Sequence, residues 1–323
     1  MPSKILIIGA GGQIGSELSA ILREKLGRDN VITSDINDKN QDMVKSGPFE
    51  IIDAKNYQDI RHCIEKHAID TVYLMAALLS ATGEKYPQKA WNLNTESLFH
   101  ILNLAKEGLI KQVFWPSSIA VFGPSTPKNN TAQSAVCEPT TVYGITKQVG
   151  ERWCEYYHNN YGVDVRSLRY PGLISHKTMP GGGTTDYAVE IYHKAVTGDN
   201  FSCFLSQDTK LPMMFMDDAI KATIDLMEAP SESLSVRSSY NLAALSFTPK
   251  EIYNSIKRHI PDFEMTYNTD FRQAIADSWP SSIDDSVARA DWNWQHDFDL
   301  EATTAEMLKH LRLKYHTETE QLS

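Results

Sequence analysis

The sequence contains little cysteine, no excess of positive charge and no long apolar run. Four cysteines, Cys63, Cys137, Cys154 and Cys203, are scattered over 323 residues without a Cys-x-x-Cys pair or a nearby histidine cluster. This distribution argues against a metal site and fits a reducing compartment. Lysine and arginine number 31 against 41 aspartates and glutamates, which gives a formal net charge of −10. Nucleic acid is therefore disfavoured as a partner, since it rewards clustered positive charge.

Membrane and targeting segments are not expected either. The longest apolar stretch, residues 72–81, is about half of the roughly 20 residues that a membrane helix needs. An apolar strand is predicted from residue 5, which leaves no room for a signal or transit peptide before it. We expect a cytoplasmic protein without membrane contact, or a mitochondrial one if a transit peptide has been removed.

Short apolar runs alternate with segments of helical periodicity through the first half of the chain. The runs cover residues 5–8, 31–34, 51–52, 71–76, 112–115 and 165–168, and apolar residues at helical spacing fill the gaps between them. This βαβαβ alternation predicts an α/β fold with a doubly wound parallel sheet of the Rossmann type. After about residue 169 the alternation loosens, which indicates a smaller α/β lobe.

A glycine-rich segment follows the first predicted strand. Gly9, Gly12 and Gly15 precede an amphipathic helix, and Asp35 lies 20 residues past Gly15, at the end of the second strand. This pattern is typical of a loop that binds the pyrophosphate of a dinucleotide, with the acid on the adenosine ribose. No lysine or arginine follows Asp35 directly, so NAD is favoured over NADP as cofactor. Asp53, at the end of the third strand, is a candidate for the adenine amino group or a solvated loop carboxylate.

Two Tyr-x-x-x-Lys pairs place a phenol and an ammonium on one face of a helix. Tyr143 and Lys147 follow the fifth predicted strand, whereas Tyr253 and Lys257 lie in the C-terminal lobe with no nucleotide motif around them. A phenol is a poor base at neutral pH, so an adjacent ammonium must favour its ionised form. The position of the first pair favours it as the catalytic one.

A serine pair ends the fifth predicted strand. Open parallel sheets bind ligands at the carboxyl ends of their strands, so Ser118 is expected to hydrogen-bond the reacting oxygen. Ser117 is the neighbour that could replace it.

The glycine segment, Ser118 and the first Tyr-x-x-x-Lys pair resemble the extended short-chain dehydrogenase/reductases, the superfamily that includes UDP-galactose 4-epimerases. More narrowly, five segments resemble the epimerase-like L-threonine 3-dehydrogenases: residues 74–80, 116–123, 168–174, 181–187 and 211–218. The resemblance implies NAD-dependent oxidation of the 3-hydroxyl of L-threonine to 2-amino-3-oxobutyrate. It also implies that Tyr143 removes the hydroxyl proton while Lys147 supports Tyr143 and the nicotinamide ribose.

The resemblance extends to the remaining site residues. The residues expected at the cofactor are Gly9, Gly12, Gln13, Ile14, Gly15, Asp35, Asp53, Leu74, Ala76, Ala77, Asn94, Tyr143, Lys147 and Tyr170. Those expected at the substrate are Ser80, Ser118, Tyr143, Thr184, Thr185 and Trp279. Asn94 could equally support the scaffold, and Trp279 could simply be packed. No metal is expected.

Two other functions remain open from the sequence. A nucleotide-sugar epimerase or dehydratase shares the fold, but the asparagine that would hold a sugar diphosphate after the sixth strand is replaced by Pro171-Gly172. Residues 212–215 also stand where such enzymes tend to carry an arginine. A protein that binds NAD only to sense it would have no need of Ser118, Tyr143 and Lys147 together.

We expect residues 1–170 to form mainly an NAD-binding Rossmann domain. Residues 171–323 are expected to form mainly a substrate-binding lobe, with a return to the Rossmann domain near residues 205–230. The resemblance also implies a homodimer in which the helices after Leu93 and after Tyr143 pair across the interface.

Overall fold

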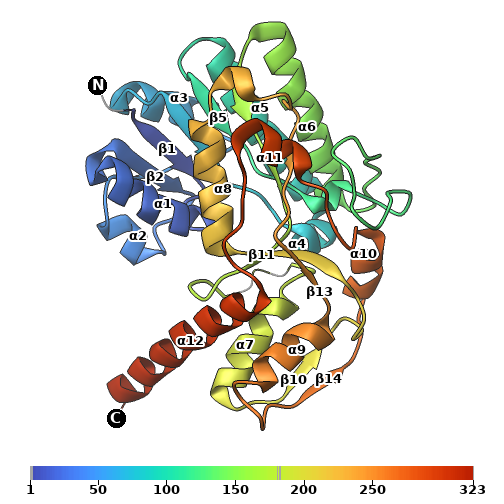
Figure 1. Ribbon diagram of the computed structural model, residues 1–323. Coiled ribbons are helices and arrows are strands. Elements are labelled where there is room, and N and C mark those ends of the chain that lie inside the picture. Colours follow the sequence, from blue (N-terminus) through green and yellow to red (C-terminus); the bar gives the residue numbers. More distant parts are fainter. Residues whose placement is uncertain (1–2, 180, 182, 323) are drawn as a thin grey trace.

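A six-stranded parallel sheet organises the N-terminal half in the computed structural model, which describes residues 3–179, 181 and 183–322. Its strand order, β3-β2-β1-β4-β5-β7, is that of a doubly wound sheet, in which the order of strand addition reverses between β1 and β4 while all strands stay parallel (Figure 1). The predicted fold class is therefore confirmed. Gly182, within the segment 181–187 discussed above, lies outside the described residues.

The strands of this sheet are β1 (Ile5–Ile8), β2 (Val31–Asp35), β3 (Phe49–Ile51), β4 (Thr71–Leu74), β5 (Gln112–Phe114) and β7 (Asp164–Arg166). The helices and 3₁₀ turns that alternate with them are α1 (Gln13–Leu26), η1 (Arg28–Asn30), α2 (Gln41–Lys45), α3 (Tyr57–His67), α4 (Ser80–Lys85), α5 (Pro87–Lys106), η2 (Ile119–Val121) and α6 (Val142–Tyr161).

The remaining elements build shorter sheets and the lobe. They are β6 (Ser117–Ser118), β8 (Leu168–Tyr170), β9 (Gly172–Ile174), α7 (Tyr187–Thr197), β10 (Phe201–Cys203), β11 (Leu211–Phe215), α8 (Met216–Glu228), η3 (Ser231–Ser233), β12 (Tyr240–Asn241), β13 (Leu245–Phe247), α9 (Pro249–Lys257), β14 (Met265–Tyr267), α10 (Arg272–Ser278), α11 (Ser286–Trp292) and α12 (Leu300–Leu322). Three small sheets have the orders β12-β8-β6, β13-β11-β9 and β10-β14.

Successive residues of β1 point to opposite faces of the sheet, as the pleat of a strand requires. Ile5 and Ile7 belong to a core with α1 and α8, whereas Leu6 and Ile8 belong to a second core with α3, α5 and α6. All four side chains are at most 4% exposed. A strand that is apolar on both faces therefore lies between two helical layers, which is why this run is continuous rather than alternating.

Late segments of the chain return to the first core. α8 and α11 lie beside the N-terminal sheet in Figure 1, although both come after residue 215 in the sequence. Ile220 of α8 packs in the same core as Ile5, and so do Trp292 and Trp294. The sequence patterns gave no sign of the contact made by the two tryptophans.

A third core fills the lobe. It joins α7, α9 and α12 with β10, in the lower part of Figure 1. α9 begins with a capping box, in which Thr248 accepts from the backbone N–H of Glu251 and the Glu251 side chain accepts from that of Thr248. Within the described part of the chain, no helix is long and apolar enough to cross a membrane.

Candidate active site

A cavity of about 230 Å³ opens at the carboxyl ends of the central strands. Such a position is where open parallel sheets bind their ligands. Fourteen of the predicted site residues line it: Gly9, Gly12, Gln13, Ile14, Gly15, Ala77, Ser80, Ser118, Tyr143, Lys147, Tyr170, Thr184, Thr185 and Trp279. Residues up to 270 positions apart in the chain thus share one site.

The glycine loop can accept a pyrophosphate. A Cβ at Gly15 would lie 2.5 Å from the carbonyl oxygen of Gly9, and one at Gly9 would lie 2.5 Å from the backbone nitrogen of Ala76. These two glycines are therefore required by close packing. A Cβ at Gly12 would meet only the Gly9 oxygen, at 3.4 Å, so this glycine leaves space on the cavity side. α1 begins there without a side-chain cap or an acidic residue in its first turn, which suits an anion.

The two predicted carboxylates lie outside the cavity lining but close to the glycine loop and the neighbouring strand. Asp35 ends β2, and its Oδ2 accepts a hydrogen bond of 2.9 Å from the N–H of Gly11. Asp53 follows β3, accepts from the N–H of Lys55 at 2.9 Å and lies 3.5 Å from the ammonium of the same lysine. Both stand at the edge of the sheet where the ribose and adenine of a dinucleotide would lie. Their contacts with the cofactor stay predictions.

The structure brings the phenol of Tyr143 to the hydroxyl of Ser118. The two side chains are hydrogen-bonded, and that bond opposes the effect of burial, which raises the pKa of Tyr143 to about 12. The Ser118 hydroxyl also accepts from the N–H of Ala120, at 3.2 Å. Ser118 is thereby held by η2 on one side and directed at the phenol on the other.

Ser117 points in another direction. Its hydroxyl donates to the carboxylate of Glu151, at 2.6 Å, and Glu151 forms a buried ion pair with Arg169, at 2.7 Å. Ser117 and Glu151 are 2% and 1% exposed. Of the two serines left open by the sequence, Ser118 is the one that contacts Tyr143.

Lys147 lies one turn after Tyr143 on α6 and is only 2% exposed. Its ammonium donates to the carbonyl oxygen of Pro116 at 2.5 Å and lies 5.5 Å from the centre of the Tyr143 ring. Burial lowers the pKa of Lys147 to about 7, while the negative charge of Glu151, one turn further along α6, opposes this effect.

Three further residues expected at the cofactor, Leu74, Ala76 and Asn94, do not line the cavity. Leu74 is 1% exposed and packs in the core between the sheet and α5. The Asn94 side chain accepts from the N–H of Leu78 and donates to the Leu78 carbonyl and to the hydroxyl of Thr146. Ala76 fits against Gly9, as described above. The hydrogen bonds of Asn94 favour its scaffold alternative, and contacts of all three residues with the cofactor stay predictions.

The residues expected at the substrate come from distant segments of the chain and line the same cavity. The Thr184 side chain is 1% exposed, and its hydroxyl is buried without a hydrogen-bond partner. Ser80 begins α4 and is 4% exposed, and Trp279, which also lines the cavity, is 7% exposed. A buried hydroxyl without a partner is unfavourable, so a polar group of a ligand would satisfy it.

Several lining residues had no signal of their own in the sequence. They are Met75, Leu79, Pro116, Ile119, Pro171, Gly172, Leu173, Gly183 and Asp186. Gly172 is explained by packing, since a Cβ there would lie 2.6 Å from the Thr185 side chain. Asp186 accepts from the N–H of Gly183 at 2.6 Å and so shapes the turn before Thr184. Most of these residues lie inside the segments that carried the family resemblance.

The second Tyr-x-x-x-Lys pair lies away from the cavity. The hydroxyl of Tyr253 donates to the carbonyl of Phe263 at 3.3 Å, and Lys257 pairs with Glu264 at 3.0 Å. Among the described residues, no group of three or more histidine, cysteine, aspartate or glutamate side chains is arranged to hold a metal ion.

Comparison with known proteins agrees with this geometry. Residues 5–243 match the model of the NAD dependent epimerase/dehydratase family. A mitochondrial L-threonine 3-dehydrogenase of Bos taurus is 46% identical over 306 residues, which cover 94% of this chain and 82% of the relative. The predicted resemblance is therefore confirmed at the level of the whole chain.

Two solved structures extend the comparison. The holo form of the GalE-like L-threonine dehydrogenase from Cupriavidus necator superposes with a TM-score of 0.93 at 58% identity, covering 95% of this chain and 99% of that one. A monomeric L-threonine 3-dehydrogenase from a metagenome superposes with a TM-score of 0.92 at 47% identity, covering 96% and 99%. The chain belongs to the NAD dependent epimerase/dehydratase family, and within it groups with proteins named L-threonine 3-dehydrogenase.

Proposed function

We propose that this protein oxidises the 3-hydroxyl of L-threonine with NAD, giving 2-amino-3-oxobutyrate. The observation that carries the proposal is the Tyr143–Ser118 hydrogen bond beside Lys147 in a small cavity that also contains the glycine loop. The names of the relatives agree with the predicted activity. The chain is an NAD-dependent enzyme of this family, and its substrate is a small molecule.

Ser118 and Tyr143 act on the 3-hydroxyl of the substrate. Ser118 orients the substrate oxygen towards Tyr143, and the phenolate of Tyr143 takes the hydroxyl proton. The glycine loop and Asp35 would hold NAD, which when bound would supply the acceptor for the C3 hydride and a positive charge that favours the phenolate. Lys147 adds positive charge and would hold the nicotinamide ribose. The proton and the hydride together account for the two electrons and two hydrogens that the alcohol loses.

The amino acid's charged groups would bind at the other end of the cavity. The unpartnered hydroxyl of Thr184, together with Ser80 and Thr185, offers hydrogen bonds to a carboxylate and an ammonium. Trp279 and Leu79 supply apolar surface for the substrate methyl. These roles rest on position in the cavity and on the polarity of the groups.

The nucleotide-sugar alternative is less well supported. Lys147 is the one basic side chain among the described residues that line the cavity, and a second pyrophosphate would need further cations. Residues 212–215, where such enzymes tend to carry an arginine, form part of β11 and are buried.

An absorbance assay for NADH tests the proposal against its alternatives. The purified protein is given NAD with L-threonine, L-allo-threonine, L-serine, 3-hydroxybutyrate or UDP-galactose. We expect L-threonine to be oxidised fastest and L-serine more slowly, because one methyl in an apolar pocket is worth about 1–3 kcal/mol. Conversion of UDP-galactose without a response to threonine would support the epimerase, and NAD binding without any turnover would support the sensor.

Asp35→Ala tests the cofactor assignment in the same assay. Loss of the carboxylate should weaken NAD binding and narrow the preference over NADP, because it removes both the ribose contact and the charge that repels a 2′-phosphate. Calorimetric titration with each dinucleotide measures the two affinities. Unchanged NAD affinity would remove Asp35 from the site.

We also propose that the protein pairs through α5 and α6. Ile145, Val149, Trp153 and Tyr156 form one stripe on α6 at spacings of four, four and three, and all are half-buried or exposed in the single chain. Trp91 of α5 is 41% exposed. Because one relative is described as monomeric, sedimentation of the protein and of Tyr156→Glu is needed. A monomeric parent would refute the dimer.

The division into an NAD-binding part (1–170) and a substrate-binding part (171–323), and the cytoplasmic location, stay predictions. Expression of a tagged chain in cells would test the location.

A further inference from the structure

Helix α1 buries a carboxylate close to the glycine loop. Glu17 lies two residues beyond Gly15 and is 3% exposed, among buried helix neighbours such as Leu18 and Leu22. An ionised carboxylate without a partner is strongly disfavoured in such a place. The partners of Glu17 therefore indicate what the residue is for.

Both partners come from one short segment after β9. The hydroxyl of Ser175 donates to Oε1 of Glu17 at 2.5 Å, and Nζ of Lys177 lies 3.1 Å from Oε2. Ser175 is fully buried, whereas the Lys177 side chain is 49% exposed. The Ser175 oxygen also accepts from the N–H of Lys177, at 3.1 Å. One carboxylate thus fixes two side chains and, through Ser175, the backbone between them.

This segment follows directly on β9, whose residues line the cavity. Immediately before it, Gly172 and Leu173 of β9 line the cavity, and after it the chain reaches Thr184 and Thr185. On its other side, the ring of His176 stacks on His310 of α12, with ring centres 4.0 Å apart and planes 8° from parallel. The start of the segment is therefore held between the cofactor helix and the last helix of the lobe.

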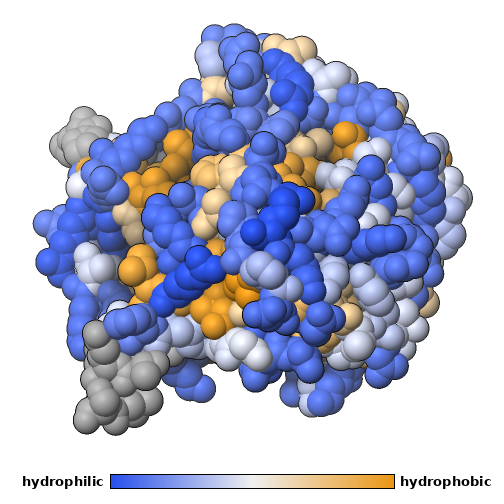
Figure 2. Space-filling model, turned by 60° about the horizontal axis from the view of Figure 1, so that its bottom comes forward, coloured by the Kyte–Doolittle hydropathy of each residue, from blue (hydrophilic) through white to orange (hydrophobic). Residues whose placement is uncertain are grey.

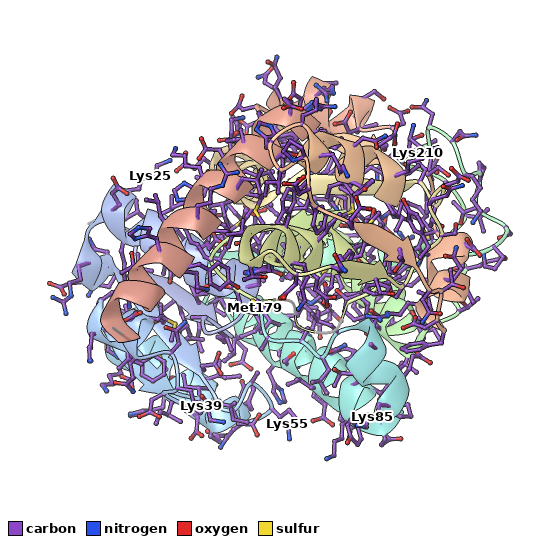
Figure 3. All side chains as sticks on the ribbon, turned by 90° about the horizontal axis from the view of Figure 1, so that it is seen from below. Lys25, Lys39, Lys55, Lys85, Met179 and Lys210 are labelled. Carbon is purple, nitrogen blue, oxygen red and sulfur yellow. The ribbon has the colours of Figure 1, made fainter. Side chains whose placement is uncertain are left out.

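Views from below show where this segment lies. Figure 3 labels Met179, which is 54% exposed, near the centre of the molecule, and the similar view in Figure 2 shows apolar surface gathered near the centre of the same face. Lys25, near the end of α1, is labelled at the outer edge. The two ends of α1 thus lie in different surroundings, one next to the site and one remote from it.

The charges of Glu17 and Lys177 affect the binding of the dinucleotide. A pyrophosphate at the start of α1 would be repelled by the negative charge of Glu17, and Lys177 neutralises that charge. Gly172 of β9, three residues before Ser175, packs against the side chain of Thr185, a residue expected at the substrate. Placing Lys177 on Glu17 therefore favours the dinucleotide and holds the end of the strand that contacts Thr185.

We propose that Glu17 is a positioning residue that links the cofactor helix to the substrate-binding segment through Ser175 and Lys177, so that NAD and the amino acid increase each other's affinity. The proposal rests on the proposed function for the identity of the amino acid. Its cofactor half depends only on NAD binding. Such a linkage is reciprocal, because each ligand must change the affinity for the other by the same factor.

The test is a double-variant cycle on the full-length protein, made of Glu17→Gln, Lys177→Met and both together. Lys25→Met is the matched control, since Lys25 pairs with Glu228 at 2.5 Å from the same helix α1 but away from the cavity. For each protein, calorimetry gives the Kd for NAD, and NADH production gives kcat and KM for L-threonine. Thermal unfolding checks that each variant is folded.

Lys177→Met should raise the Kd for NAD by about five- to tenfold, because it exposes the dinucleotide to an uncompensated carboxylate. Glu17→Gln and the double variant should bind NAD within about twofold of the parent, since the repelling charge is gone. All three should raise the KM for threonine by about five- to tenfold with a smaller change in kcat, because the segment is no longer held. Lys25→Met should change none of these values.

Equal NAD affinity in all four proteins, or a rise in Kd for the double variant as large as that for Lys177→Met, would overturn the proposal. So would unchanged threonine KM in a protein that oxidises threonine. If the parent does not oxidise threonine at all, the proposed function fails, and the NAD arm of the cycle still decides whether Lys177 shields the cofactor from Glu17.

Discussion

The two Tyr-x-x-x-Lys pairs have nearly the same local geometry. The ammonium of Lys147 lies 5.5 Å from the centre of the Tyr143 ring, and that of Lys257 lies 5.6 Å from the centre of the Tyr253 ring. Both distances follow from a spacing of one helical turn. The motif alone therefore does not distinguish a catalytic pair from a structural one.

The surroundings of the two pairs differ in burial, in hydrogen-bond partners and in the direction of the lysine pKa shift. Lys147 is buried, donates to the Pro116 carbonyl and has its pKa lowered to about 7 by burial. The Lys257 side chain is 31% exposed, and its hydrogen bond to Glu264 raises its pKa. Tyr143 meets Ser118, whereas the hydroxyl of Tyr253 donates to a backbone carbonyl. The comparison teaches that the helix supplies the spacing and that burial beside a nucleotide loop supplies the chemistry.

The largest expected effect distinguishes the two tyrosines by their effect on kcat. Tyr143→Phe keeps the ring but removes the proton acceptor, so kcat should fall by roughly 10²–10⁴-fold. Tyr253→Phe removes a hydroxyl remote from the cavity, and its kcat should stay within about twofold of the parent, as for most substitutions outside the site. NADH production from threonine measures both, with NAD titration as the check on folding. Loss of activity in Tyr253→Phe alone would mean that the wrong pair was chosen.

The next effect separates the neighbouring serines. Ser118→Ala should lower kcat by about 10²-fold, because the oxygen of the substrate loses its orienting hydroxyl. Ser117→Ala should change kcat much less and instead lower the thermal unfolding midpoint, because a buried oxygen of Glu151 loses its donor. Steady-state kinetics and thermal unfolding of both variants provide the two measurements. The opposite assignment of the two effects would make Ser117 the catalytic serine.

A smaller effect concerns pH. Burial raises the pKa of Tyr143 to about 12, so positive charge from bound NAD and from Lys147 must bring it down for catalysis. At saturating NAD, kcat should rise with pH to a plateau, and Lys147→Met should move the midpoint upward. A shift of one unit would lower kcat about tenfold below the midpoint. Lys257→Met should leave the profile unchanged, and an identical shift in both variants would contradict the comparison.

Much of this site could be predicted from the sequence, because its signals are local. The glycines, the strand ends and the Tyr143–Lys147 spacing lie within short segments whose geometry is set by the backbone. The parallel sheet then brings the carboxyl ends of its strands to one edge. Fourteen predicted residues meet in the cavity for this reason.

The remainder depends on contacts between distant segments. The role of Asn94 depends on Leu78 and Thr146, and Ser117 is distinguished from Ser118 only by the position of Glu151. The same limit applies to protonation. Burial lowers the pKa of Lys147 to about 7, and no local pattern in the sequence reveals the surroundings that bury it.

The smallest expected effect is on the pH dependence of stability. It follows from the burial of Lys147 and compares the two lysines without any ligand. An unfolded lysine has a pKa near 10.4, whereas that of Lys147 is lowered to about 7. Between these values the unfolded chain binds more protons than the folded one, so the Lys147 contribution makes stability rise with pH in this window. Below pH 7 both states are protonated, and the full cost of burying the charge remains. Lys147→Met should therefore raise the unfolding midpoint of the cofactor-free protein by a few degrees at pH 6 to 7, with about 2–4 °C for each kcal/mol in a large domain. The gain should shrink as pH approaches 10.

Lys257 provides the control. Its pKa is raised in the folded protein, so it affects stability only above the pKa of an unfolded lysine. Lys257→Met should therefore show no such trend between pH 7 and 10. Thermal unfolding of the two variants and the parent at pH 6, 8 and 10 measures the difference, and parallel curves for both variants would show that Lys147 keeps an ordinary pKa.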